Sequence, residues 1–151
     1  MPCRPSSSIP AEPVPAGTGT SRQVLIGPDV GPNFALRKFV IEPGGGMPLH
    51  TNTVEHEQYV LGGRARVVIG DELLEVKKDD VVYIPGGVPH SYEALGTESF
   101  EFLCAVPNHP DQIKVIDPSM PESPEGTDDL VVPESPEGTD DMVVPEDELG
   151  C

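Results

Sequence analysis

The chain has 151 residues, which is enough for one domain with a buried core but too few for two domains of ordinary size. Hydrophobic residues make up only 36% of it, and 19 prolines and 16 glycines are many for a globular protein, so we expect part of the chain not to fold. Residues 1–116 carry 14 acidic and 9 basic groups without a Lys/Arg cluster, which argues against a nucleic-acid partner.

Residues 1–22 are predicted to form a disordered arm, because they are mostly Pro, Ser, Gly, Ala and Thr with isolated apolar residues. This segment lacks the charged-then-apolar pattern of a signal peptide. No apolar run in the chain approaches the roughly 20 residues that a membrane helix needs. We therefore expect a cytoplasmic protein that has no membrane partner.

The central segment, residues 23–117, has the pattern of an all-β domain. Short stretches rich in Val, Ile, Phe and Tyr alternate with turn residues, and no convincing helical stripe is present. This pattern predicts a β-sandwich or β-barrel with almost no helix. The expected strands include residues 34–42, 58–61, 64–69, 81–84 and 99–106.

Three of the four histidines fall where neighbouring strands can direct them towards one point. His50, Asn52 and His56 share a parity, so an extended chain places them on one face. His90 follows a PGGVP turn and, with Tyr92, would point inward from the next run. Imidazole is a natural ligand for Zn, Fe, Mn, Ni or Cu. The spacing alone leaves two interpretations open: a shared metal site, or histidines that are packed and hydrogen-bonded in the core.

The C-terminal residues 118–151 contain a 12-residue tandem repeat, PESPEGTDDLVV at 121–132 and PESPEGTDDMVV at 133–144. Each unit holds two prolines, one glycine and four acidic residues, which predicts an acidic disordered tail. A solubilising role is the simplest interpretation. A docking motif built on the LVV and MVV triplets, or weak capture of cations by the carboxylates, are the alternatives.

The stretch PGGGMPLHTNTVEHEQYVLGGRARVVIG, followed by DDVVYIPGGVPH, resembles the two motifs of the cupin superfamily. The matching positions are Gly44, His50 and Gly63 in the first motif and Pro85, Gly87 and His90 in the second. The resemblance implies that residues 23–117 form a double-stranded β-helix, the jelly-roll or cupin barrel. Cupins of this size generally pair or exchange edge strands, so the resemblance also implies a homodimer.

Four positions depart from the family pattern. Asn52 stands where the family usually has its second histidine, and His56 occupies the usual glutamate position. Asp79 replaces the opening glycine of the second motif, and Ala94 replaces its terminal asparagine. The resemblance implies one divalent metal (Mn, Fe, Cu, Ni or Zn) held by His50, His56 and His90. Asn52 would bind that metal weakly or through a water.

A histidine in the glutamate position, within Glu55-His56-Glu57, is similar to the small four-histidine manganese cupins. That subgroup also has patterns matched here by Asn33, Phe34 and Arg37 and by Phe102, Leu103 and Cys104. The resemblance implies a substrate pocket lined by Arg37, Phe102 and Cys104. Phe102 and Cys104 share a parity and equally suit an ordinary core, and Tyr92 suits either a ligand contact or the core.

Three functions are compatible with these residues. The first is a metal-dependent oxygenase (dioxygenase or other oxidoreductase) acting on a small organic substrate, with Arg37 and Tyr92 as substrate-contacting residues. The second is a redox-neutral, metal-dependent isomerase or lyase of sugars or small acids. The third is a non-catalytic module that binds a small molecule. Fold membership does not choose among them, because cupins support many chemistries.

Overall fold

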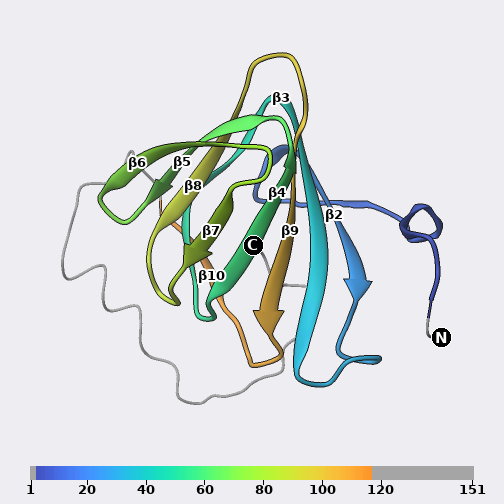
Figure 1. The fold of residues 1–151 in the computed structure, drawn as a ribbon. Coiled ribbons are helices and arrows are strands. Elements are labelled where there is room, and N and C mark those ends of the chain that lie inside the picture. Colours follow the sequence, from blue (N-terminus) through green and yellow to red (C-terminus); the bar gives the residue numbers. More distant parts are fainter. Residues whose placement is uncertain (1–2, 117–151) are drawn as a thin grey trace.

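The computed structural model describes residues 3–116, and most of these are in β-strands (Figure 1). The elements of this part of the chain are η1 (Ser6–Ser8), β1 (Glu12–Pro13), β2 (Thr18–Ile26), β3 (Phe34–Asn52), β4 (His56–Gly62), β5 (Arg64–Ile69), β6 (Glu72–Lys77), β7 (Val81–Ile84), β8 (His90–Leu95), β9 (Phe100–Pro107) and β10 (Ile113–Val115). Among them no helix is long and apolar enough to cross a membrane. The predicted acidic tail and its repeat lie outside the described residues.

The long strand β3 connects the two parts of one curled antiparallel sheet (Figure 1). Its first half pairs with β2 and β9, and Phe39 lies opposite Phe102 there. Its second half pairs with β8 and β10, and His50 lies opposite His90 there. The strand order β6-β5-β8-β3-β9-β4-β7 confirms the predicted jelly-roll fold.

The PGGG segment at 43–46, whose composition is typical of a turn, lies inside β3 and lets one strand serve both parts of the sheet. Gly44 has a φ of 85°, in the left-handed region that favours glycine. A Cβ at Gly46 would collide with the carbonyl oxygen of Tyr92 on β8. The glycines therefore bend β3 and allow β8 to approach it, without ending the strand.

Inward-facing side chains of β3, β4, β5, β8 and β9 form the core. Its apolar end, as we call it, contains Phe39, Ile41, Val60, Phe100 and Phe102, all at most 1% exposed. Phe39 and Phe102 stack with their ring centroids 5.3 Å apart. Buried polar side chains on β3, β4 and β8 lie further along the interior, and they carry the candidate site.

Residues 3–22 belong to the fold, which corrects the prediction of a disordered N-terminal arm. β2 begins at Thr18 and pairs with β3, and β1 pairs with β2. Thr20 is buried, and its hydroxyl donates to the carbonyl of Gly46 at 3.2 Å. Gln23 Nε2 donates to two carbonyl oxygens at the η1 turn, at 2.9 and 2.7 Å. These hydrogen bonds order the N-terminal segment, although its low apolar content did not predict an ordered structure.

Candidate functional site

The structure brings the three predicted histidines together at one end of the barrel interior, which we call the histidine end. His50 lies on β3, while His56 and His90 begin β4 and β8. All three are at most 1% exposed. The ring centroids of His50 and His90 are 4.2 Å apart, and those of His56 and His90 are 5.6 Å apart. Three strands, β3, β4 and β8, therefore bring the three imidazoles to one place.

Two of the imidazoles have their tautomer fixed by the backbone. The Nδ1 atom of His50 lies 2.7 Å from the carbonyl oxygen of Pro48, and that of His90 lies 2.9 Å from the carbonyl oxygen of Val88. A carbonyl oxygen only accepts, so each Nδ1 must carry the proton. Each Nε2 then carries a lone pair, which is the arrangement that metal-binding histidines have when a carbonyl orients the ring.

Burial keeps His56 and His90 neutral at neutral pH. It lowers the pKa of His56 well below the usual value, and the nearby Arg37 lowers it further. Burial and the neighbouring His50 lower the pKa of His90 to about 4. Neutral imidazole is the form that binds a metal, so the chemistry of this donor set fits a transition-metal ion. Within residues 3–116 no three His, Cys, Asp or Glu side chains already stand as a formed metal site, so ligation requires ring movement.

Asn52 lies two residues after His50, faces the same interior and is only 2% exposed. Its Nδ2 donates to Oδ2 of Asp111 at 3.0 Å. Its Oδ1 is buried and has no hydrogen-bond partner among the described residues. Both predicted roles of Asn52, weak ligand and hydrogen-bond acceptor for a bound water, need this free oxygen.

Arg37 is a fully buried cation on the first half of β3, at 1% exposure. Burial, followed by the nearby Arg22, lowers its pKa to about 9, so the guanidinium remains charged at neutral pH. Its Cζ atom lies 5.7 Å from the ring centroid of Phe39, at the border of the apolar end. In the register of β3 with β9, Arg37 is opposite Cys104.

Tyr92 lies between the histidine end and the apolar end. Its ring centroid is 5.9 Å from that of His90 and 5.3 Å from that of Phe102. Its hydroxyl accepts a 2.7 Å hydrogen bond from Nε2 of Gln58, and burial raises its pKa. The hydroxyl is therefore protonated. Because it accepts the hydrogen bond from Gln58, its own proton can be donated to another group. Phe102 and Cys104 both point inward, and Phe102 belongs to the stacked core.

Two residues of this region were not identified from the sequence. Gln58 shares the parity of His56 on β4, and that alternation was a usable signal. Asp111 had no such signal, because it lies in a short loop after β9. Its Oδ1 accepts from the backbone amides of Thr53 at 2.6 Å and Val54 at 3.2 Å. Burial raises the pKa of Asp111, and these hydrogen bonds oppose that shift.

The departure from the family motif at Asp79 has a structural explanation. Asp79 is the only non-glycine residue among residues 3–116 with a positive φ, 74°, which is a conformation that glycine adopts freely. Its carboxylate accepts a 2.9 Å hydrogen bond from the hydroxyl of Tyr59. Asp79 therefore keeps the turn that the motif glycine makes, away from the histidines.

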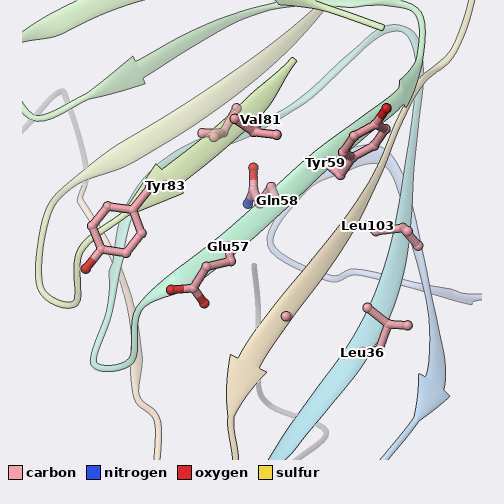
Figure 2. A pocket seen from close by; sticks show the side chains of 9 residues that line it. Leu36, Glu57, Gln58, Tyr59, Val81, Tyr83 and Leu103 are labelled. Carbon is pink, nitrogen blue, oxygen red and sulfur yellow. The ribbon is translucent and has the colours of Figure 1, made fainter. Parts of the chain in front are cut away.

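A groove of about 540 Å³ lies on the outer face of β7, β4, β9 and β3 (Figure 2). Figure 2 shows Val81 and Tyr83 on β7, Tyr59 on β4 and Leu103 on β9 along this surface. Val81 is 74% exposed and Tyr83 is 54% exposed, which is high for such residues. This groove is on the opposite side of the sheet from the three histidines.

Comparison with known proteins gives a consistent family assignment. The sequence profile of the cupin domain (Cupin_2) matches residues 37–106. The polyketide cyclase RemF from Streptomyces resistomycificus has a similar structure, with a TM-score of 0.71 and 30% identity over 84% of this chain and 92% of that protein.

Two curated proteins are similar in sequence. An uncharacterized protein of Methanocaldococcus jannaschii is 33% identical over 89 residues, which cover 57% of this chain and 71% of that protein. The 1-methylthio-D-xylulose 5-phosphate methylsulfurylase of Rhodospirillum rubrum is 35% identical over 86 residues, 57% of this chain. The matched part spans only 54% of the methylsulfurylase.

Proposed function

Because the chain belongs to the cupin family, we propose that it is a metal-dependent enzyme that acts on a small organic molecule. One divalent transition metal is held by His50, His56 and His90. The observation that carries this proposal is the pair of Nδ1–carbonyl hydrogen bonds at His50 and His90, which make Nε2 the unprotonated nitrogen of both rings. A histidine that served only as core would gain that Nδ1 hydrogen bond too, but the buried Nε2 of His90 would then have no hydrogen-bond partner among the described residues.

Substrate binding is assigned to the polar residues between the histidines and the apolar end. The guanidinium of Arg37 binds a carboxylate or carbonyl oxygen, because a buried cation favours a negative partner. The hydroxyl of Tyr92 donates its proton in a hydrogen bond to a second oxygen, and Gln58 holds that hydroxyl in place. A metal bound by neutral ligands keeps its full charge and supplies Lewis-acid polarisation of a substrate oxygen.

For the reaction class we favour redox-neutral chemistry, such as isomerisation, lysis or cyclisation, over the oxygenase predicted first. Two similar proteins are named as a polyketide cyclase and a methylsulfurylase, and neither name is that of an oxygenase. A carbonyl-bearing substrate held by Arg37 and Tyr92 fits such chemistry. A module that binds a small molecule without turnover is the remaining alternative.

Metal analysis of the purified protein, reconstituted separately with Mn²⁺, Fe²⁺ and Zn²⁺, tests the site. We expect about one equivalent in the wild type and loss of that metal in His50→Ala, His56→Ala and His90→Ala. His109→Ala is the matched control, because His109 is exposed in the loop before β10. Metal that survives the three interior substitutions would refute the proposed site.

The reaction class is tested with a panel of small carboxylates and β-diketones. Redox-neutral chemistry predicts turnover under argon with the Zn²⁺ form. Turnover that requires Fe²⁺ and consumes dioxygen would restore the oxygenase hypothesis. Saturable binding without turnover in every metal form would favour the binding module.

For the assembly we propose a homodimer in which a second copy covers the outer groove. β7 is a terminal strand in the sheet order and carries Val81 and Tyr83 at the rim of that groove. One two-fold contact would therefore cover both an unpaired strand edge and the apolar surface beside it. Exposed aromatic and aliphatic side chains gathered on one face are typical of such interfaces.

A further inference from the structure

The loop between β9 and β10 controls one polar group of the interior. We propose that Asp111 is a positioning residue, which fixes the side-chain amide of Asn52 so that Oδ1 and not Nδ2 is presented to the histidine end. This inference rests on the proposed metal site. It explains how an asparagine serves where the family usually has a histidine.

The orientation of the Asn52 amide follows from its contact with Asp111. A carboxylate only accepts hydrogen bonds, so the group 3.0 Å from Oδ2 of Asp111 must be the Nδ2 donor. The opposite orientation would place two oxygen atoms against each other in a buried environment. With Nδ2 held, Oδ1 is the end of the amide that has no partner among the described residues, and Asn52 is 2% exposed.

Asp111 is itself held in place by two backbone donors. Its Oδ1 accepts from the amides of Thr53 at 2.6 Å and Val54 at 3.2 Å, just after β3 ends. The side chain is only 6% exposed, so water does not compete strongly for these bonds. One carboxylate oxygen therefore anchors the loop to the chain, and the other orients Asn52.

As a consequence, the histidine end presents hydrogen-bond acceptors, and these determine the charge of the ion or molecule that can bind there. His90 contributes a buried Nε2 with a lone pair and no hydrogen-bond partner among the described residues, and Asn52 contributes Oδ1. These two acceptors favour a metal cation, or a water that the cation orients, over an anion. If the amide were reversed, it would present a donor there and oppose a cation.

The substitution Asp111→Asn separates the two roles of the carboxylate. Its remaining oxygen can still accept from the amides of Thr53 and Val54, so the loop stays anchored. Its new NH₂ group faces Asn52 and forces that amide to turn, which points Nδ2 towards the histidines. In the double variant Asn52→Asp/Asp111→Asn the donor and acceptor are exchanged, and an oxygen faces the histidines again.

Titration calorimetry with Zn²⁺ on the metal-free full chain tests this. We expect Asp111→Asn to weaken Zn²⁺ binding by about 10- to 100-fold, the usual effect of losing an outer-shell partner. The double variant should return to within about threefold of the wild type or bind more tightly. Asp80→Asn is the matched control, because Asp80 also accepts from a backbone amide, that of Lys77, in a remote turn. Unchanged binding in Asp111→Asn, or no recovery in the double variant, would overturn the proposal.

A second measurement works without metal and separates this inference from the proposed function. In ¹⁵N NMR spectra of the metal-free protein, the side-chain NH₂ of Asn52 should exchange slowly with D₂O. In Asp111→Asn its chemical shift should change and its protection should fall. If the wild type shows this signature but binds no metal, the proposed function fails and the positioning role stands. If the NH₂ exchanges freely in the wild type, the positioning role fails whatever the metal does.

Discussion

At the apolar end of the barrel interior, Phe39 and Phe102 stack and exclude water, whereas at the histidine end His50, Asn52 and His90 bury hydrogen-bonding atoms. The same strands build both ends. β3 provides Phe39 near its start and His50 near its close, and β8 passes from His90 through Tyr92 to apolar positions.

The difference between the two ends indicates how the fold combines stability with chemistry. Burying aromatic rings stabilises the folded state, while burying imidazoles and a guanidinium costs free energy that hydrogen-bonding or charged partners must offset. Placing both on shared strands lets the apolar end hold the polar side chains in position. Variants at the apolar end should therefore mainly change stability, whereas variants at the histidine end should also change its chemistry.

Phe102→Ala should lower the free energy of unfolding by about 3–5 kcal/mol, because it removes a fully buried ring and leaves a cavity. Urea denaturation followed by circular dichroism measures the loss. Leu73→Ala on β6, at 65% exposure, is the control and should change stability by less than about 0.5 kcal/mol. Similar losses in the two variants would mean that the apolar end does not provide the main stability.

Acidification should destabilise the metal-free protein through the histidine end. The pKa of His90 is about 4 in the folded state, against 6.5 ordinarily, so between these values the unfolded chain binds more protons. Above pH 6.5 the titration of His90 does not lower the free energy of unfolding. As the pH drops to 4, it lowers this free energy by up to about 3 kcal/mol. The pKa of His56 is shifted in the same direction, and that of Asp111 in the opposite one.

The difference between wild type and His90→Gln isolates this histidine, because the other groups titrate in both proteins. We expect the pH slope of stability between pH 4 and 6.5 to be shallower in His90→Gln. Equal slopes would show that His90 does not remain neutral in the folded state.

Tyr92→Phe should cost about 1 kcal/mol of stability, because it removes the hydroxyl that accepts from Gln58 and leaves the ring in place. Thermal unfolding measures the change, and turnover should fall more than substrate binding. Tyr83→Phe removes an exposed hydroxyl that donates to Glu55, and it is the matched control with almost no effect. If both variants behaved alike, the buried hydroxyl would have no special role.

Val81→Lys should change the stability of the subunit by less than about 0.5 kcal/mol, because the side chain is 74% exposed. It should nevertheless convert a dimer to a monomer, as measured by light scattering after gel filtration. Val30→Lys, at an exposed position outside the groove, should leave the mass unchanged. A wild-type monomer would contradict the proposed assembly.

The histidine end was largely predictable from the sequence, because motif spacing and the inward–outward alternation of a strand involve only residues that are close in the sequence. His90 follows a recognisable turn, His50 follows a glycine-rich bend inside β3, and alternation placed Tyr92 inward. The resemblance also singled out Arg37, which the structure buries. These residues are fixed by their own strands.

What the sequence did not reveal depends on contacts between distant segments. Asp111 has no pattern around it, and only the return of the chain to β3 brings it to Asn52. The N-terminal residues looked too polar to order, but β3 supplied hydrogen-bonding partners for β2. The PGGG run does not reveal the role of Gly46, which is to allow the close approach of β8.

The pairing of β3 with β10 also affects how the protein is made. β3 ends at Asn52, but its partner β10 starts only at Ile113, so this edge of the strand stays open during most of translation. Pairing across such long sequence separations is slow and exposes strand edges in the meantime. A nascent chain still tethered to the ribosome before Asp111 emerges has an Asn52 amide that nothing orients. Metal loading is therefore expected only after Asp111 has emerged and β10 has paired with β3.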